Sequence, residues 1–399
     1  MCGHSGATAR GLYQIVNMVS CMTSDPVEIL KSLVSIKSYS GNEGEIAYTI
    51  RDLLGENGVD KAFVDEYGNV IGTIRGESRA KIVFEGHMDV VPPGDLEQWK
   101  YPPFEPVIVD NKIYGRGTAD MKGAIASMIS SIPLINNPVA DIYFVFVPYE
   151  EIAEGVCFSK AIEETLKINP DLVILGEATK LNVYRGHRGR AVIKIDIKGI
   201  SAHASMPELA LNPIVSLAYT IVRLREVNLP VHPELGRSTL SPTIIRCEPQ
   251  SSPMIPDRCE IIIDYRMIPS EKKDEIIMKI KSHVKDIDGV TSVHYLVENA
   301  RMWTGKTIRI EHYFPAWIYD GNLCIEALGL TRKYYEEAKL GYWRFSTDGV
   351  YSAGTKNIPT IGIGPGNEEL AHKPNEYVPI KELYIARRIY AELAISLFH

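Results

Sequence analysis

The sequence predicts an α/β protein with two parts. One is a mixed, mostly parallel sheet with helices on both faces, and the other is an inserted α+β domain of the ferredoxin-like kind. Continuous apolar runs at 142–147 and 358–363 are typical of strands buried on both faces. Between 184 and 299 the order of elements changes to β-α-β-β-α-β, and the strand at 191–197 alternates as if one face were exposed. We therefore expect two separate sheets in one chain.

The elements before the inserted domain follow from caps, turns and hydrophobic periodicity. Asp25 followed by Pro26 is a typical helix start, and the turn around Gly68 separates two short strands. The long loop that begins at Pro92 has no predicted structure of its own, which is common in functional loops. The expected elements are helices 26–36 and 41–54, strands 62–64, 70–74 and 80–84, helix 124–135, strand 142–147, a helix from 154, and strand 171–175.

The later elements divide between the inserted domain and a return of the α/β pattern. Pro213 marks the start of a helix, and the terminal helix begins near Ile380. Inside the insertion we expect strand 191–197, helix 212–227, strands 241–247 and 259–267, helix 270–286 and strand 291–297. After it we expect helix 320–328, a short helix opened by 345–349, strand 358–363 and the terminal helix. The predicted organisation is a poorly structured N-terminus at 1–23, a catalytic domain at 24–183 and 300–399, and the inserted domain at 184–299.

Composition excludes several classes of function. The chain has 399 residues, 45% hydrophobic and 23% charged, which is ordinary for a soluble globular protein. Its formal charge is −7 and it has no long basic tract, so we expect no nucleic-acid partner. The mildly apolar stretch 11–21 is interrupted by polar residues, and we expect neither a signal peptide nor a membrane partner. Met22 could be an alternative start.

The six cysteines are scattered, with no Cys-x-x-Cys pair. This distribution argues against a sulfur-ligated zinc site and against a disulfide framework. A reducing cytosol is the simplest compartment for such a chain, so we expect a cytoplasmic protein.

Histidines and carboxylates follow the predicted strands, where the crevice of an open α/β sheet binds its ligands. Each has an ordinary explanation: Asp120 could cap a helix, the two adjacent glutamates could begin a solvated helix, and either histidine could be structural. Nearly all of them lie just past a buried strand of one sheet, and chance does not readily explain this shared position. Imidazole and carboxylate without thiolate suit paired Zn²⁺, Co²⁺ or Mn²⁺. The residues are His87, Asp89, Asp120, Glu150, Glu151, Glu177 and His372.

These motifs identify the chain as resembling the M20 family of metallopeptidases and deacylases, which includes acetylornithine deacetylase and succinyl-diaminopimelate desuccinylase. The resemblance runs from about residue 25 to the end. The matching stretches are Gly86-His87-Met88-Asp89-Val90-Val91, Gly115-Arg116-Gly117 with Asp120-Met121-Lys122-Gly123, Glu150-Glu151, Gly176-Glu177, and Ala371-His372 with Asn375-Glu376. Four further stretches resemble the selenium-metabolism-linked hydrolase subfamily: 183–190, 303–305, 313–315 and 345–349.

The resemblance implies a role for each site residue. Two divalent metal ions, Zn²⁺ first and Co²⁺ or Mn²⁺ as alternatives, would be bound, with Asp120 bridging them. His87 and Glu177 would complete one metal site and Glu151 and His372 the other. Asp89 would support His87 from behind. Glu150 would be the general base that takes a proton from the metal-bridging water, a task that suits a carboxylate beside two metals.

The resemblance also implies residues outside the metal centre. His203 matches a histidine that the inserted domain offers to the substrate in the neighbouring subunit; the alternative is a surface histidine. Arg266 matches an arginine that holds a substrate carboxylate, and the alternative is an ordinary salt bridge. Where many members have an asparagine before the Ile-Pro of this segment, this chain has Pro253 ahead of Met254. Specificity therefore does not transfer directly from better-known deacylases.

We therefore expect a dinuclear metal-dependent hydrolase that cleaves an amide bond of a small N-acyl amino acid or dipeptide-like substrate, as a deacetylase or desuccinylase does. The alternative is a metallo-carboxypeptidase, dipeptidase or aminoacylase of the same fold. A non-catalytic binding protein is a third reading, although every ligand and Glu150 are present. The inserted domain would act as a lid and as the contact between the subunits of a homodimer.

Overall fold

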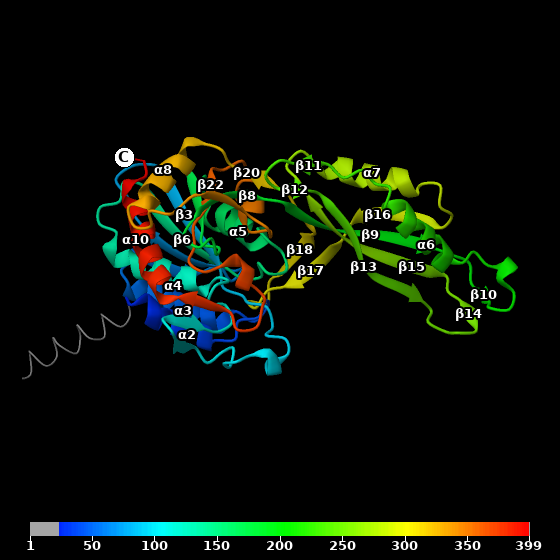
Figure 1. Cartoon of the computed structure of the whole chain (residues 1–399), viewed down its shortest axis with the longest axis horizontal. Helices are drawn as coiled ribbons and strands as arrows, with labels where there is room; N and C mark the ends of the chain where they lie inside the picture. The colour runs from blue at the N-terminus through cyan, green and yellow to red at the C-terminus, as the bar shows by residue number, and fades with distance from the viewer. Residues whose placement is uncertain (1–23, 399) are drawn as a thin grey trace, which may run out of the picture.

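The computed structural model describes residues 24–398 and has two parts joined at a narrow junction (Figure 1). A nine-stranded sheet lies in the larger part and a five-stranded sheet in the smaller part. This confirms the predicted fold class, a mixed α/β protein with a second α+β unit. The predictions for residues 1–23 fall outside the described residues.

The larger sheet is parallel at its centre, and its outer pairs are antiparallel except for β21 with β8. Its order is β1-β2-β6-β3-β7-β22-β8-β20, with β21 also paired to β8. Strands β6, β3, β7 and β22 run parallel to one another, so their carboxyl ends lie along one edge of the sheet. The strands are β1 (Lys61–Val64), β2 (Val70–Ile74), β3 (Lys81–His87), β6 (Asp141–Val147), β7 (Leu172–Leu175), β8 (Val183–His187), β20 (Trp317–Ile318), β21 (Leu340–Trp343) and β22 (Thr360–Gly362).

Helices cover both faces of this sheet because alternate side chains of its buried strands point to opposite faces. Phe84 belongs to the core under one set of helices, and its neighbour Val83 belongs to the core under the other set. The first set is α2 (Pro26–Ser35), α3 (Gly44–Glu56), α4 (Lys122–Ser131), α8 (Asn322–Arg332) and α10 (Ile380–Ser396). The second set is α5 (Val156–Lys160), the π-helical η3 (Ala161–Leu166) and α9 (Gly349–Ser352).

The smaller sheet has the strand order of a split βαβ unit. The chain order is β9, α6, β13, β15, α7, β16, and the sheet order is β13-β15-β9-β16 with each neighbouring pair antiparallel. Helices α6 and α7 pack on one face of it. The bounds are β9 (Gly189–Lys198), α6 (Pro213–Leu224), β13 (Thr239–Glu248), β15 (Arg258–Met267), α7 (Lys273–Val284), β16 (Val290–Tyr295) and β19 (Tyr313–Phe314), which pairs with β9.

Short pairs and turns complete the described chain. β10 (Ala202–His203) pairs with β14 (Met254–Ile255) at the tip of the smaller part, far from the larger sheet (Figure 1). The other short elements are β4 (Val107–Val109), β5 (Lys112–Tyr114) and β23 (Tyr377–Pro379), the pairs β11 (Val231–His232) with β12 (Gly236–Arg237) and β17 (Val297–Arg301) with β18 (Thr307–Glu311), and the single turns η1 (Leu96–Gln98), η2 (Ile132–Leu134), η4 (Pro207–Leu209) and η5 (Glu368–Leu370).

Three details differ from the sequence-based expectations. Strand β3 continues through His87, because its parallel pairing with β6 reaches Val147. Residues 183–187 form β8 of the larger sheet, so the smaller sheet begins only at Gly189. Cys247 and Cys259 form a disulfide between β13 and β15. The expectation of no disulfide was therefore wrong, since strand register, which brings these two residues opposite each other, cannot be read from cysteine spacing.

Among residues 24–398, no helix has both the length and the apolar character needed to cross a lipid bilayer.

Candidate active site

The candidate residues meet at the carboxyl edge of the larger sheet. His87 is the last residue of β3, Glu150 and Glu151 follow β6, and Glu177 follows β7. His372 lies in the loop that follows β22 and η5. Neighbouring parallel strands thus deliver these side chains to one place. Residues far apart in the sequence become neighbours for this reason.

Asp120 stands between two groups of possible metal ligands. Its Oδ1 lies 3.0 Å from Nε2 of His87, and its Oδ2 lies 3.4 Å from Nε2 of His372. Glu177 Oε1 is 3.6 Å from His87 Nε2. Glu151 Oε2 is 2.8 Å from His372 Nε2. The structure therefore forms the groups His87–Asp120–Glu177 and Asp120–Glu151–His372, which share Asp120.

The donor set of these groups fits two divalent transition-metal ions. It consists of imidazole nitrogens and carboxylate oxygens without thiolate, a combination that suits Zn²⁺, Co²⁺ or Mn²⁺. His87 Nδ1 is 2.9 Å from the carbonyl oxygen of Asp89, and that bond leaves Nε2 free to act as a ligand. Within residues 24–398, the buried oxygens Glu150 Oε1 and Glu177 Oε2 have no hydrogen-bond partner. Unpaired buried carboxylate oxygens are costly, and cations beside them would remove that cost.

The electrostatics show how closely the acidic groups are crowded. Burial raises the pKa of Glu177 and the pKa of Glu150 well above their usual range. Burial also raises the pKa of Glu151, and the neighbouring Asp120 adds to the shift. Burial alone would lower the pKa of His87, but its hydrogen bonds to Asp120 and Asp89 raise it well above the ordinary value. The clustered carboxylates therefore favour a compensating positive charge, which protons supply in part and metal ions would supply when bound.

The ordinary explanations fail for two of these residues. Asp120 does not cap α4, because Met121 occupies the N-cap position and no side chain caps it there. Glu150 is not solvated, since only 6% of it is exposed. His372 is the exposed member of the cluster, with 56% of its side chain accessible. The site therefore opens to solvent on the side of His372.

Asp89 holds the loop that carries the two glutamates. Its Oδ1 accepts a hydrogen bond from the Glu150 backbone N–H at 3.1 Å, and its Oδ2 accepts one from the Glu151 N–H at 3.2 Å. Ser40 Oγ donates to the same Oδ2 at 2.6 Å. The carboxylate is 3.7 Å from Nδ1 of His87. Asp89 thus supports His87 mainly through its carbonyl group, while its carboxylate positions the loop after β6.

Glu376 is a residue of the site for which the sequence motif suggested no role. Its carboxylate is buried and accepts hydrogen bonds from the backbone N–H groups of Gly117, Ala119 and Asp120 at 3.1, 2.8 and 3.1 Å. Arg116 donates to it at 2.8 Å. Burial raises the pKa of Glu376 to about 7, although Arg116 acts in the opposite direction. Glu376 fixes the loop that presents Asp120.

A second buried acid group lies behind His87. Glu85, two residues before His87 on β3, lies beside Asp348, and Asp348 Oδ1 accepts a hydrogen bond from the Gly155 N–H. Burial raises the pKa of Asp348 to about 6. Asp348 belongs to the stretch 345–349 that the motif resemblance singled out, so the motif was the only available signal. The pair ties the short helix α9 to the end of β3.

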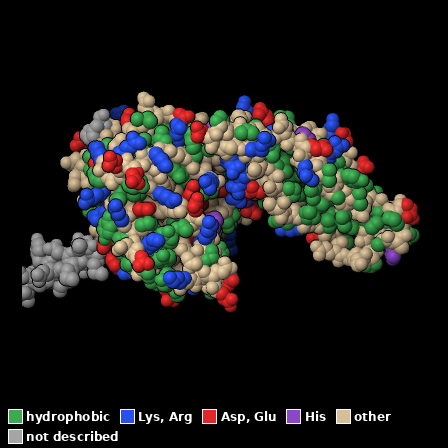
Figure 2. Space-filling model, in the orientation of Figure 1, with side chains coloured by type: hydrophobic (Ala, Val, Ile, Leu, Met, Phe, Trp, Pro, Cys, Tyr) green, Lys and Arg blue, Asp and Glu red, His purple; other side chains and the backbone are tan. Residues whose placement is uncertain are grey.

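A cleft of about 460 Å³ contains the site. Its floor consists of Asp120, Glu150, Glu151, Glu177 and His372, and its opposite side includes three residues of the smaller domain: Arg190, Asp264 and Arg266. The space-filling view shows the molecule hollowed between its two parts, with Lys and Arg side chains gathered near their junction (Figure 2).

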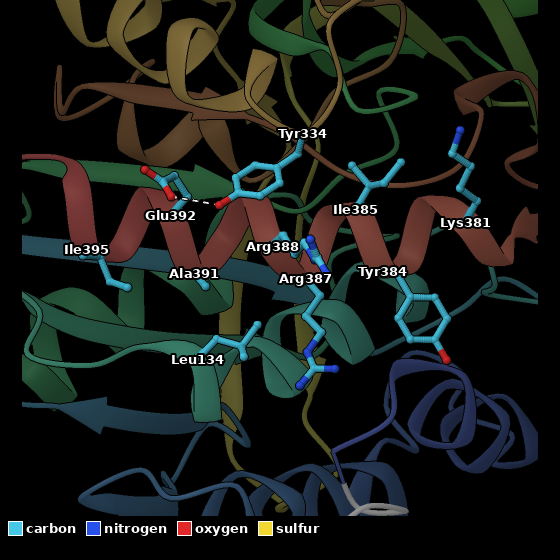
Figure 3. Close-up of a pocket in the computed structure, with 10 residues that line it drawn as sticks. All are labelled: Leu134, Tyr334, Lys381, Tyr384, Ile385, Arg387, Arg388, Ala391, Glu392 and Ile395. Atoms are coloured by element: carbon cyan, nitrogen blue, oxygen red, sulfur yellow. Dashed lines mark hydrogen bonds between the residues drawn. The ribbon is translucent and has the colours of Figure 1, made fainter.

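A larger cavity lies along α10 and contains no such cluster. The close-up shows Tyr334 hydrogen-bonded to Glu392, with the other lining side chains spread along α10 except for Leu134, which comes from η2 (Figure 3). Tyr384 donates to Asp25, and Arg387 donates to the carbonyl of Ser130. These polar groups already have protein partners, so the cleft with the histidines is the candidate active site.

The structure does not bring His203 to this cleft. His203 lies on β10, at the tip of the smaller domain (Figure 1), and its Nδ1 contacts the hydroxyl of Ser205 at 2.7 Å. Arg266 does line the cleft, but Asp264 already engages its guanidinium group at 2.8 and 3.2 Å. The ordinary salt bridge considered for Arg266 is thus present.

Comparisons with known proteins agree with this geometry. The family model described as Peptidase family M20/M25/M40 matches residues 83–396. An uncharacterized Escherichia coli (strain K12) protein, YgeY, is 32% identical over 94% of each chain. The succinyl-diaminopimelate desuccinylase of Ehrlichia ruminantium (strain Gardel) is 27% identical and covers 95% of this chain and 99% of its own. The Bacillus subtilis YxeP protein, described as a dinuclear metal-binding M20 peptidase, has a TM-score of 0.69 at 18% identity, covering 94% and 97%.

The fold and the paired ligand groups define the class as a metallohydrolase. The chain belongs to peptidase family M20, as its motifs indicated.

Proposed function

We propose that this protein hydrolyses an amide bond of a small N-acyl amino acid or dipeptide-like substrate, with two divalent metals in the cleft. The observation that carries the proposal is the position of Asp120 between two complete ligand groups, with Glu150 buried beside them. His87 and Glu177 would hold one ion, Glu151 and His372 the other, and Asp120 both. Zn²⁺ is the first candidate for the metal, and Co²⁺ or Mn²⁺ are alternatives.

Glu150 is proposed as the general base. Two bound metals would polarise the scissile carbonyl and lower the pKa of water. Glu150 then accepts a proton from the attacking water and delivers it to the leaving nitrogen, as a nearby carboxylate can.

The smaller domain is proposed as a lid and as the contact in a homodimer. Its helix α6 exposes large apolar side chains: Ile214, Val215, Tyr219 and Val222. Strand β13 forms an edge of the smaller sheet and exposes Ile244 and Ile245, and hydrophobic side chains cover much of this part in the view (Figure 2). Pairing two such edges across a twofold axis would bury this surface. The remote position of His203 supports a role in the neighbouring subunit's cleft, where it would donate to the oxyanion.

A cytoplasmic location is proposed from cysteine usage. The disulfide between Cys247 and Cys259 is an exception to this usage, because disulfides are rare in reducing compartments.

The remaining alternative is a carboxypeptidase, dipeptidase or aminoacylase activity at the same site. A panel of N-acetyl amino acids, N-succinyl amino acids and dipeptides, assayed on zinc- and cobalt-loaded protein, separates these activities. Preferred turnover of the acylated amino acids supports the deacylase proposal, and preferred turnover of dipeptides favours the alternative. Absence of turnover across the panel at full metal loading contradicts both.

A further inference from the structure

Two arginines from neighbouring strands of the smaller domain face the cleft. Arg190 on β9 lies directly opposite Arg266 on β15 in the antiparallel register, and both line the cleft. Like charges in directly opposed positions of adjacent strands destabilise a sheet. Such a pair therefore needs negative groups between or beside the guanidinium groups.

The protein supplies only part of that compensation. Arg190 Nη1 donates to Glu154 Oε1 at 3.0 Å, whereas its Nε is 4.0 Å from Asp264. Asp264 instead binds Arg266. A guanidinium group has five N–H donors, and within residues 24–398 neither guanidinium group makes a further hydrogen bond. Several donors therefore remain for a ligand in the cleft.

The cleft is accordingly divided by charge. Its floor carries the carboxylates and histidines proposed to hold the metals, and its lid side carries the two guanidinium groups together with the single carboxylate of Asp264. A substrate whose carbonyl lies at the metals would point its other end toward the arginines. Planar guanidinium forks match the two oxygens of a carboxylate.

We infer that Arg190 and Arg266 together form a carboxylate subsite, and that Arg190 is a specificity-determining residue of this enzyme. The resemblance pointed to Arg266 alone, so Arg190 is the added element. The inference rests on the proposed function, and it restricts the substrate to compounds with a free carboxylate on the lid side of the scissile amide.

Glu154 acts as the internal competitor of the substrate. It is 6% exposed, it follows the loop of Glu150 and Glu151, and its Oε2 has no hydrogen-bond partner within the described residues. Its contact with Arg190 joins the two domains in the absence of substrate. A bound carboxylate takes up the remaining donors of Arg190 and competes with Glu154 for this group.

Equilibrium binding of two probes that differ only in charge tests the subsite. The probes are N-acetyl-L-alanine and N-acetyl-L-alaninamide, titrated calorimetrically into the full-length, zinc-loaded Glu150→Gln protein, in which turnover is blocked. With Arg190 intact, the acid is expected to bind more tightly than the amide. Adding Arg190→Gln is expected to weaken binding of the acid by roughly 10- to 100-fold, which corresponds to the loss of a charge-assisted hydrogen bond. Binding of the amide should be nearly unchanged.

Three further variants sharpen the result. Arg188→Gln is the matched control, because Arg188 is two residues away and donates to the carbonyl of Arg237 outside the cleft lining. This variant should change the affinity for neither probe. Arg190→Lys keeps the charge without the fork and should recover part of the affinity for the acid. Glu154→Gln removes the competitor and should tighten binding of the acid several-fold.

Two results overturn the inference. One is equal weakening of acid and amide by Arg190→Gln in a protein whose thermal unfolding is unchanged, which would make Arg190 a structural residue. The other is the absence of any preference for the acid with Arg190 intact, including failure of both probes to bind. Failure of the proposed hydrolase function looks different, because the preference for the acid would persist while the parent protein with Glu150 turned over no member of the substrate panel.

Discussion

The buried carboxylate of Glu376 accepts a hydrogen bond from the backbone N–H of Asp120 at 3.1 Å. Glu376 stands four residues after His372 in the sequence. One short segment therefore contains His372, a candidate ligand of the second group, and also fixes the loop that carries Asp120, the candidate ligand that both groups share. The relative position of the two ligand groups depends on this segment.

Glu376→Gln is expected to weaken binding of the second metal by roughly 10- to 100-fold, the effect usual for groups that orient metal ligands. The amide nitrogen would face backbone N–H donors and push the Asp120 loop away. Metal content after dialysis against buffers of fixed free zinc measures the effect. Glu271→Gln is the matched control, since the buried Glu271 also accepts a backbone N–H, from Ile268, but lies in the smaller domain. Equal metal content in Glu376→Gln and the parent protein would refute the positioning role.

Stabilisation by zinc is expected to grow with pH. In the metal-free protein, burial raises the pKa of Glu150 and the pKa of Glu177 above the unfolded value of 4.5. As pH rises above that value, the unfolded chain binds fewer protons than the native one, so the metal-free protein loses stability. Bound cations remove this cost. The gain in Tm on adding zinc should therefore be larger at about pH 8 than at about pH 6.

Glu177→Gln provides the comparison for the pH experiment, because it deletes one titrating carboxyl group and should flatten the dependence. If the zinc-induced gain in Tm of the parent protein were smaller at the higher pH than at the lower pH, the electrostatic explanation would be wrong. Scanning calorimetry with chelator and with saturating zinc gives both curves.

Complementation between subunits tests the role of His203. A His203→Ala chain and a Glu150→Ala chain should each be inactive as homodimers. Because β10 lies far from the cleft of its own chain, mixed dimers should regain about one working site if His203 acts in the neighbouring subunit. Differently tagged chains, purified in tandem, isolate the mixed dimer. An inactive mixed dimer would show that His203 acts in its own subunit or has no catalytic role.

The sequence predicted the fold class for a physical reason, and the same reason places the candidate ligands side by side. Buried parallel strands are continuous apolar runs, and the residues directly after these runs lie at one edge of the sheet. His87, Glu151 and Glu177 could therefore be grouped without coordinates. Contacts that depend on register or on loop packing could not. The Cys247–Cys259 pair and the pairing of Arg190 with Arg266 both result from the alignment of β15 with its neighbours.

The loops show the same limit. The sequence marked Asn375 and Glu376 as part of a motif, but only the folded chain shows Glu376 against three backbone N–H groups. It also shows Asn375 holding the long loop through Gln98 and Lys100. The long loop that begins at Pro92 has a length that is common in functional loops. The structure ties it to the segment that carries His372, which is a contact across more than 270 positions.

The most direct test of the account is the turnover number of Glu150→Gln measured together with its metal content, on the best substrate of the panel. Gln keeps the size of the side chain but cannot take a proton from water. We expect both metals to stay bound while kcat falls by at least about 100-fold. Near-normal kcat with two metals bound would contradict this expectation.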